Sequence, residues 1–533
     1  MHLPPRIFDD TLHDEFPTVN FPPDVVERKL LGLKTFSSPG PDGLHPLVLK
    51  SCASILKVPL SLIYDKSMAT GRLPSDWRLT NITPIFKSGK KNEPSNYRPI
   101  NLCSIPCKIM ESIIKDEMIQ HLTMNELVDP SQHGFLPGKS CTTNLLTYLD
   151  EVTSALDNGV PYDVIMIDFR RAFDLVPFKH LIRKLEAHGI VGELLQWLSD
   201  WTRNRAQRVV LNGVSSSWVD VLSSVVQGSV LGPVLFIVFI NDIDLEIHDP
   251  HIKMFKYADD SKLGRPIRSE SDAAALQSAL DNIVRWSDRW GMDIHPMKTQ
   301  VIHFGFNNRR HAYTMNNLKI AEVSSAKDLG VIVSESCKPS EHVSETVRKA
   351  NGILAQLNRT IVSRDKDIVT RLYKVFVRPI IESAVPAWCP WERQDINALE
   401  KVQRRATRLI PSIGKLEYDE RLKICKLTTL EERRRRGDVL EVFKMINGFT
   451  NIDVSSFFRF CSQRHDAATR SVTNKLLVPE KCHLDIRKYF FTNRIVKHWN
   501  ELPLEIRETS SVNSFKNMYD SWILCNQEND NID

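Results

Sequence analysis

The chain of 533 residues has no apolar run of membrane length, no signal-peptide pattern at Met1 and no internal repeat. These absences argue against a membrane protein, a secreted precursor and a repeat array. The ten cysteines are scattered between Cys52 and Cys525 without a CxxC pair. Cys103 and Cys107 have a CxxxC spacing with no matching pair nearby, which argues against a zinc site. Scattered thiols of this kind fit a reducing intracellular compartment.

Positive charges outnumber negative charges only slightly. The formal net charge is +5, which does not by itself indicate nucleic-acid binding. Arginines cluster locally at Arg404, Arg405 and Arg408 and at residues 433–436, in a half of the chain that is rich in helical patterns. Such clusters can add salt-dependent affinity for phosphates. For residues 433–436, a solvated helix face is an equally good interpretation.

The composition indicates a folded protein. Hydrophobic residues make up 42% of the chain and charged residues 25%, as in globular proteins. A chain of this length is too long for one core and should contain several subdomains.

Three aspartates are the most informative feature. Asp168 ends the apolar run 164–167, and Asp259 and Asp260 follow the strand-like stretch that ends at Tyr257. Carboxylates that converge from two strand ends can hold two divalent cations for in-line nucleotidyl transfer. Mg²⁺ prefers such hard oxygen ligands, and Mn²⁺ is a possible substitute. An isolated Asp-Asp pair is usually a solvated turn, so the neighbouring motifs must support this interpretation.

A basic ribbon precedes the aspartates. Residues 81–86 are strand-like, residues 87–91 form a basic turn, and residues 98–102 are a second short apolar piece. Lys87 and Arg98 on such a ribbon could clamp a triphosphate. Taken alone, these residues are better explained as an ordinary basic hairpin.

Two further segments carry candidate nucleotide contacts. Phe173 lies five residues after Asp168, where its ring could pack under a sugar and exclude a 2′-hydroxyl, or could be a core residue. It starts a helical pattern over 170–188 that Pro177 must bend or delay. Gln227 can contact a base pair or sugar, and Gly228 allows close approach of the backbone to a ligand. They precede the apolar run 234–240, which predicts a buried helix.

The segment around the paired aspartates predicts a hairpin over 254–263 with its turn at the two carboxylates. An amphipathic helix is expected over 273–290. Lys298 then precedes a strand-like stretch. It could protonate a departing pyrophosphate as a general acid, or be a surface lysine at the start of a strand.

Taken in order, these motifs resemble the reverse transcriptases of non-LTR retrotransposons, in the jockey and chicken-repeat-like lineage. The resemblance runs from about residue 24 almost to the end of the chain. The matching segments are 96–102 (NYRPINL), 132–135 (QHGF), 168–174 (DFRRAFD), 227–233 (QGSVLGP), 257–260 (YADD), 298–299 (KT), 325–331 (SAKDLGV), 399–410 (LEKVQRRATRLI) and 499–503 (WNELP).

The resemblance implies an α/β (α+β) fold of the right-hand polymerase type. Its parts would be fingers, a palm with an antiparallel sheet and helices, a helical thumb, and a mostly helical C-terminal region. The expected boundaries are an irregular leader at 1–23, fingers at 24–160, palm at 161–310, thumb at 311–410 and a C-terminal region of open role at 411–533.

The resemblance also implies roles for individual residues. The metal ligands would be Asp168, Asp259, Asp260 and the backbone carbonyl of Phe169; the nucleotide contacts would be Lys87, Arg98, Phe173, Gln227 and Gly228; and Lys298 would be the acid. The sequence departs from the usual pattern at Arg170 and Arg171, at Ser261 and at His295, and none of these changes removes a metal ligand.

The expected function is that of an RNA-directed DNA polymerase, a nucleotidyltransferase with two Mg²⁺ ions. Its partners would be an RNA template, a DNA primer or target and dNTPs, with no membrane. We expect assembly with RNA in the cytoplasm and function in the nucleus. The polymerase motifs begin almost at once, so we expect the N-terminal endonuclease domain of such elements to be missing and a nick to be made elsewhere.

Two alternatives remain at this point. One is a nucleic-acid-binding relic without polymerase activity, which the intact aspartates and Lys298 argue against. The other is an intron-type maturase, which the tail at 499–503 makes less suitable than the retrotransposon lineage.

Overall fold

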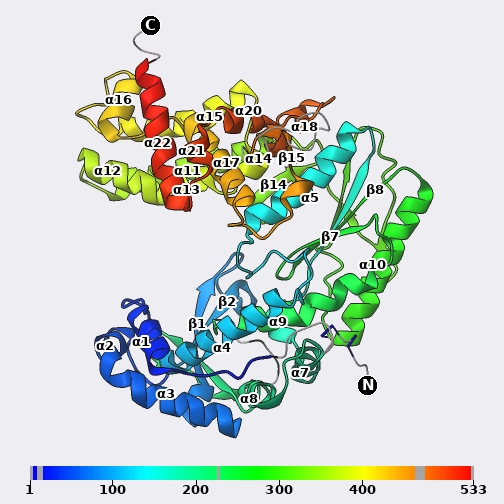
Figure 1. Ribbon diagram of the computed structural model, residues 1–533, viewed down its shortest axis with the longest axis vertical. Helices are drawn as coiled ribbons and strands as arrows, with labels where there is room; N and C mark the ends of the chain where they lie inside the picture. The colour runs from blue at the N-terminus through cyan, green and yellow to red at the C-terminus, as the bar shows by residue number, and fades with distance from the viewer. Residues whose placement is uncertain are drawn as a thin grey trace.

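The computed structural model describes residues 4–5, 7–8, 16–221, 223, 225, 228–461 and 475–529. Helices and several sheets are mixed along the chain, which confirms the α/β class. Figure 1 shows the helices of the N-terminal part at one end of the molecule and those of the C-terminal part at the other. None of the helices in the described ranges combines the length and apolar character needed to cross a membrane.

The first sheet contains the predicted basic ribbon. β1 (Leu79–Phe86) and β2 (Tyr97–Leu102) pair in antiparallel fashion, with Ile85 opposite Arg98. Gly89 has a positive φ of +88° in the turn between them, a conformation that glycine adopts without steric cost. β1 also pairs in parallel with β4 (Ala206–Leu211), which comes from a segment more than a hundred residues later.

Short strands and helices complete this part of the molecule. β4 carries the two short strands β5 (Val214–Ser215) and β6 (Val219–Asp220). The surrounding helices are α1 (Pro23–Leu31), α2 (Pro46–Ser51), α3 (Ala53–Thr70), α4 (Ile105–Met124) and α8 (Gly192–Trp201).

The second sheet carries the aspartates. Its strand order is β12-β9-β3-β8-β7, all antiparallel except for the β12–β9 pair. The strands are β3 (Tyr162–Ile167), β7 (Lys253–Tyr257), β8 (Asp260–Pro266), β9 (Gln300–Phe304) and β12 (Ala321–Glu322). The predicted strands at 163–168, 254–263 and after Lys298 are therefore confirmed.

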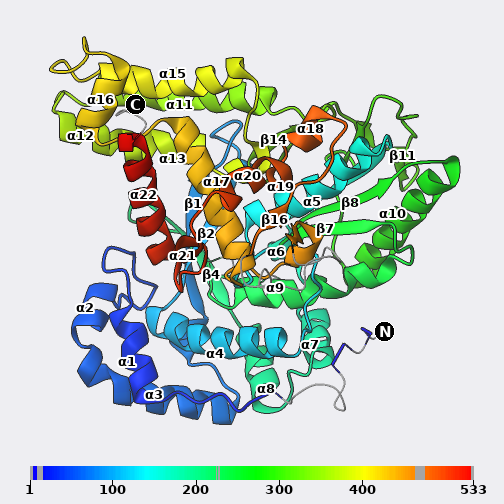
Figure 2. The same cartoon turned by 45° about the horizontal axis from the view of Figure 1, so that its top comes forward.

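Helices cover both faces of this sheet because its side chains alternate. Ile165 and Leu263 belong to one buried cluster, together with α9 (Gly232–Ile240) and α10 (Glu270–Trp290). Val164 and Phe255 belong to a second cluster, which includes α5 (Cys141–Asp157) and residues of the C-terminal part. Figure 2 shows α5 and α9 on opposite sides of β7 and β8. The four longer strands of the sheet, β3, β7, β8 and β9, are thus packed between two sets of elements, whereas both residues of β12 are exposed.

Local sequence signals set the boundaries of the helices near this sheet. Pro177 separates α6 (Ala172–Leu175) from α7 (Phe178–Ala187), as its missing N–H and fixed φ require. The capping box of Ser269 and Asp272 starts α10, and Gly291 in the left-handed region ends it.

The C-terminal part is mostly helical, and one helix that the sequence predicted is divided into three short ones. Helical spacing of apolar residues predicts helices over 343–357, 366–377, 430–446 and 487–501. The first three are confirmed as α11 (Ser340–Thr360), α12 (Lys366–Leu372) with a π-helical turn over Tyr373–Val377, and α17 (Leu430–Ile446). The stretch 487–501 is instead divided into α18 (Asp485–Lys488), α19 (Phe491–Arg494) and α20 (Val496–Asn500). Its apolar residues face the second cluster from several short turns rather than one face.

The arginine run at 433–436 largely makes contacts within the protein. Arg433 forms a bidentate pair with Glu382, and Arg436 does the same with Asp520. Arg434 is buried. The interpretation as a fully solvated helix face is therefore wrong for Arg434, and the pairing of its neighbours leaves less of the run available for phosphates.

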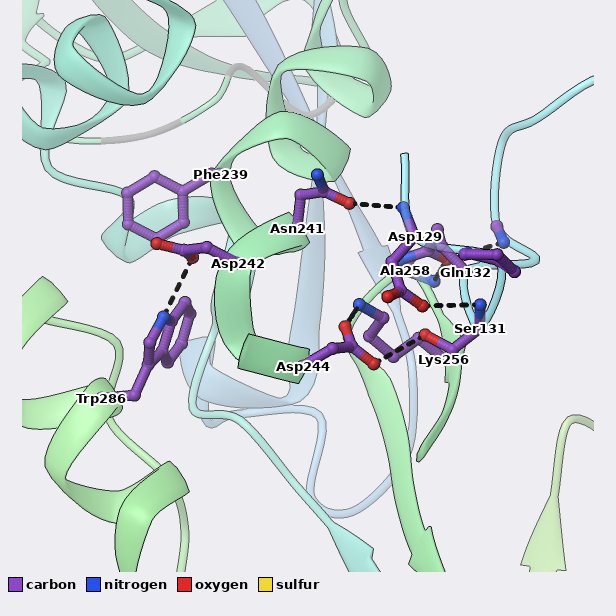
Figure 3. Close-up of polar contacts among 12 residues, drawn as sticks. Asp129, Ser131, Gln132, Phe239, Asn241, Asp242, Asp244, Lys256, Ala258 and Trp286 are labelled. Atoms are coloured by element: carbon purple, nitrogen blue, oxygen red, sulfur yellow. Dashed lines mark hydrogen bonds and ion pairs between the residues drawn. The ribbon is translucent and has the colours of Figure 1, made fainter. Parts of the chain in front are cut away.

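A buried ion pair links three elements beneath the second sheet. The Lys184 ammonium on α7 donates to the Asp242 carboxylate at 2.6 Å and to the Phe239 carbonyl at 2.7 Å. Asp242 is the second residue of a 3-10 helix, η3 (Asn241–Glu246). Its carboxylate also accepts a hydrogen bond from the Trp286 indole of α10 at 3.0 Å (Figure 3). Burial lowers the pKa of Lys184 to about 8, although Asp242 opposes this shift.

We predict that Asp242→Ala will lower the free energy of unfolding by about 3–5 kcal/mol, because it leaves the Lys184 ammonium buried without its carboxylate. Urea denaturation followed by circular dichroism measures the change. Asp288→Ala is the control, since Asp288 is exposed on α10 and its loss should cost less than about 0.5 kcal/mol. Equal effects of the two substitutions would contradict the prediction.

Candidate active site

A cleft of about 1660 Å³ lies between the basic ribbon and the carboxyl end of β3. Its walls come from both sheets and from the segments that connect them. The predicted site residues that line it are Lys87, Arg98, Asp168, Phe169, Phe173, Gly228, Asp259, Asp260 and Lys298. Gln227 lies outside the described residues. Residues spread over more than 200 positions of the sequence therefore meet in one place.

Strand register places the three aspartates together. Ile167 pairs with Ser261, so Asp168, the next residue, follows β3 at the point where Asp260 begins β8. Tyr257 pairs with Asp260 across a two-residue turn of Ala258 and Asp259. The turn was expected at both aspartates, but Asp260 is already the first residue of the strand. Residues 257–260 are called the aspartate turn below.

The backbone around Asp168 is held by the segment before Lys298. The Asp168 carbonyl accepts from the His295 N–H at 2.7 Å, and the Arg170 N–H donates to the Asp293 carbonyl at 2.8 Å. These two hydrogen bonds form an isolated antiparallel bridge between Phe169 and Ile294. The bridge uses the carbonyl of Asp168 and the N–H of Arg170, and the carbonyl of Phe169 takes no part in it.

Removal from water, together with the neighbouring negative charges, raises the pKa of the paired carboxyls. Partial removal from water raises the pKa of Asp259, the negative charge of Asp168 adds to this, and Arg98 and Lys87 oppose it. Removal from water, then the charge of Asp259, raises the pKa of Asp260 to about 6. The basic ribbon is thus close enough to act electrostatically on the aspartates.

The donor set fits hard divalent cations. Three carboxylates and one backbone carbonyl are oxygen ligands of the type that Mg²⁺ takes in phosphate-binding sites. Within the described ranges, no group of three or more His, Cys, Asp or Glu side chains is already arranged as a metal cluster. The aspartate side chains would therefore have to turn toward one another around an ion, which would also relieve their repulsion.

Lys298 reaches the same carboxylates. Its ammonium lies 3.7 Å from a carboxylate oxygen of Asp168, and the two side chains are 64% and 43% exposed. An ion pair with this exposure contributes little to stability. Lys298 is therefore free to exchange Asp168 for another anion in the cleft.

Phe173 packs against the core and also lines the cleft. Its ring stacks on Phe236 of α9, with centroids 4.4 Å apart, and so belongs partly to the core. The ring also lines the cleft, next to Phe135 in an edge-on contact at 6.3 Å. Packing from behind holds the ring in place at the cleft wall.

Gly228 is required by a close approach between two segments. Its φ is +105°, and a Cβ there would lie 2.7 Å from the Asn101 carbonyl oxygen of β2. Any side chain at this position would push the loop away from the basic ribbon. The observed partner of Gly228 is thus the backbone of β2.

Phe135 is a cleft residue that sequence reasoning did not single out. It has a φ of +56°, its side chain is 48% exposed, and its ring contacts both Phe173 and Tyr257. The QHGF motif contained it, but no local pattern separates an exposed phenylalanine in a loop from a buried one. Asp293 and His295 also line the cleft and were not predicted as site residues.

Comparison with known proteins agrees with this geometry. Residues 88–333, which include most of the basic turn, Arg98 and all three aspartates, match the family described as Reverse transcriptase (RNA-dependent DNA polymerase). The matched residues contain the whole second sheet and strands β2, β4, β5 and β6 of the first sheet, whereas β1 and Lys87 precede them.

Three of the curated relatives come from mobile elements of Drosophila melanogaster. The chain is 29% identical over 405 residues to the probable RNA-directed DNA polymerase from transposon BS. This alignment covers 73% of this chain and 44% of the relative. The corresponding protein of the X-element is 24% identical, over 75% of this chain and 45% of the relative. The polymerase of mobile element jockey is 23% identical, over 73% and 43%. The chain thus matches less than half the length of these relatives, and the resemblance to the non-LTR lineage is confirmed.

We predict that Asp260→Asn will stabilise the ion-free protein at pH 8. The pKa of Asp260 is higher in the folded than in the unfolded protein, so ionisation of this carboxyl costs stability above about pH 6, and the cost shrinks as the pH falls toward 4. Allowing for solvent screening of an exposed carboxylate, we expect a gain of about 1 kcal/mol at pH 8 and about a third of that at pH 4.5.

Urea unfolding in EDTA at the two pH values measures this difference, with Asp288→Asn as the matched control. A destabilised Asp260→Asn protein at pH 8 would contradict the repulsion argument.

Proposed function

We propose that this protein is an RNA-directed DNA polymerase of a non-LTR retrotransposon. It would join a dNTP to the 3′-hydroxyl of a DNA primer on an RNA template. The observation that supports this most strongly is the meeting of Asp168, Asp259 and Asp260 opposite Lys87 and Arg98 in one cleft, most of which belongs to the residues that match the reverse transcriptase family. Carboxylates for cations and cations for phosphates are the two parts that nucleotidyl transfer needs.

Asp168, Asp259, Asp260 and the carbonyl of Phe169 would hold two Mg²⁺ ions, with Mn²⁺ as a possible substitute. When bound, the ions would lower the pKa of the primer hydroxyl and neutralise charge on the leaving pyrophosphate. The carboxylates would hold these ions at the end of the primer. The register of β3 and β8 sets the positions of Asp168 and Asp260 relative to each other.

Side chains of this protein would hold the triphosphate. Arg98 can contact phosphate oxygens through two N–H groups, and Lys87 can supply a point charge. Lys298 would leave Asp168 for the phosphates and give its proton to the departing pyrophosphate oxygen. Its exposure allows both the movement and reprotonation from solvent.

The layout supports the division of a right-hand polymerase. We assign the fingers to residues 24–160, the palm to 161–310, the thumb to 311–410 and a helical C-terminal region to 411–533. β4 lies in the palm range but pairs with β1 of the fingers. A nicked target strand would supply the primer, and we place this step in the nucleus, after assembly with RNA in the cytoplasm. An endonuclease activity would make the nick.

The main test is primer extension on poly(rA)/oligo(dT) with Mg²⁺, comparing the wild type with Asp259→Asn. Loss of one metal-binding carboxylate should lower the extension rate by roughly 10²–10³-fold. Asp288→Asn should extend like the wild type. No extension by a folded wild type that binds the template would contradict the proposed function and favour a nucleic-acid-binding relic.

A second prediction concerns the sugar of the incoming nucleotide. Phe173→Val should remove the wall that a 2′-hydroxyl would meet and should lower the preference for dTTP over UTP by about tenfold or more. The ratio of kcat/KM for the two nucleotides measures this preference. An unchanged ratio in a less stable protein would mean that Phe173 serves only the core.

A further inference from the structure

The segment 131–134 lies directly against the aspartate turn. The Lys256 N–H donates to the Ser131 carbonyl at 2.9 Å, and the His133 N–H donates to the Lys256 carbonyl at 2.8 Å. Gln132 and Lys256 thereby form a parallel bridge at the outer edge of β7. The proposed mechanism assigns no role to this segment.

The Gln132 side chain reaches beyond the bridge to the turn itself. Its carbonyl oxygen accepts from the Ala258 N–H at 2.9 Å and from the Gly134 N–H at 2.7 Å. Both partners are backbone donors, so the oxygen of the amide must face them. The Gln132 side chain is buried, and within the described part of the chain its amide nitrogen has no hydrogen-bond partner. Leaving that group unpaired has a cost, which the two bonds to the oxygen offset.

Space at this contact is also restricted. A Cβ on Gly134 would lie 2.4 Å from the Ala258 nitrogen, so only glycine lets the two backbones approach this closely. Ala258 has a φ of +56°, a left-handed conformation that is sterically unfavourable for an alanine. Contacts from outside the hairpin must therefore help to hold the turn in this conformation.

A second set of contacts anchors the segment to η3. Lys256, which is fully buried, forms an ion pair with Asp244, and Asp244 also accepts from the Ser131 hydroxyl at 2.8 Å. The Asn241 side chain accepts from the Asp129 N–H at 2.9 Å. Figure 3 shows these residues between η3 and the aspartate turn, with Gln132 beside Ala258. Hydrogen bonds and an ion pair to η3 thus hold the segment from which the Gln132 side chain accepts.

We propose that Gln132 is a positioning residue that sets the conformation of the aspartate turn, and through it the place of the Asp259 and Asp260 carboxylates. This inference deepens the proposed function and rests on it for its catalytic consequence. Gln132 itself does not line the cleft. Its effect passes through the Ala258 N–H, one residue before Asp259.

The first test measures the contact without any catalysis. Hydrogen exchange of the full chain, read on peptides that cover residues 254–262, should show at least about tenfold faster exchange in Gln132→Met, which has a similar size but no acceptor. Gln132→Glu retains an acceptor oxygen and should keep most of the protection. Unchanged exchange in Gln132→Met would overturn the proposal.

Gln403→Met is the matched control for general destabilisation. Gln403 is also fully buried and hydrogen-bonded, to the hydroxyls of Tyr373 and Tyr418 and to the Thr428 carbonyl, but in α15 (Arg393–Arg408). Its substitution should lower stability without changing exchange at residues 254–262. Faster exchange there in both variants would overturn a specific role for Gln132.

The second test measures the catalytic consequence by single-nucleotide extension. Gln132→Met should lower kcat by about 10- to 100-fold, because small displacements of catalytic groups have effects of this size. The KM for primer–template should stay within about twofold, and Gln403→Met should keep its kcat. An unchanged kcat in Gln132→Met would overturn the proposal. An inactive wild type would instead overturn the proposed function, and hydrogen exchange alone would then decide whether Gln132 holds the turn.

Discussion

Repulsion among three carboxylates is the constraint on which this structure depends. Asp168, Asp259 and Asp260 are brought together by strand register, and no local preference of the chain would place three like charges side by side. Removal from water and the neighbouring carboxylates raise the pKa of both Asp259 and Asp260, so the fold holds these two groups where their charged forms are disfavoured. The neighbouring elements must therefore hold the backbone firmly, since the side chains favour separation.

Each carboxylate has its own support. The bridge between Phe169 and Ile294 holds Asp168 from one side. The segment around Gln132 holds the aspartate turn from the other, and η3 joins that segment to α10 through Asn241, Asp242 and Asp244. These supports come from buried amides and ion pairs, which are sensitive to geometry and leave few alternative arrangements. The result is a backbone held in place, from which the aspartate side chains could turn toward an arriving ion.

Local patterns in the sequence predicted the elements better than their contacts. The ribbon over residues 79–102, the strand before Asp168 and helix α17 follow from alternation, helical spacing and caps, all of which are encoded within a few residues. The parallel pairing of β1 with β4 has no local signal, because it joins segments far apart in the chain. The same holds for Gln132 and Ala258, which are separated by 126 positions. The arginine run at 433–436 likewise found partners at Glu382 and Asp520 that no neighbouring residue indicated. The motif resemblance placed the aspartates in one site, whereas only the structure shows what holds them there.

The most direct test of the central claim is the number of cations held by these carboxylates. Electron paramagnetic resonance can count Mn²⁺ bound to the full chain in complex with a chain-terminated primer, an RNA template and the next dNTP. The account predicts two ions per protein in the wild type and at least one fewer in Asp168→Asn, at a Mn²⁺ concentration that saturates the wild type. Equal numbers in both proteins would show that the cations lie elsewhere and would contradict the account.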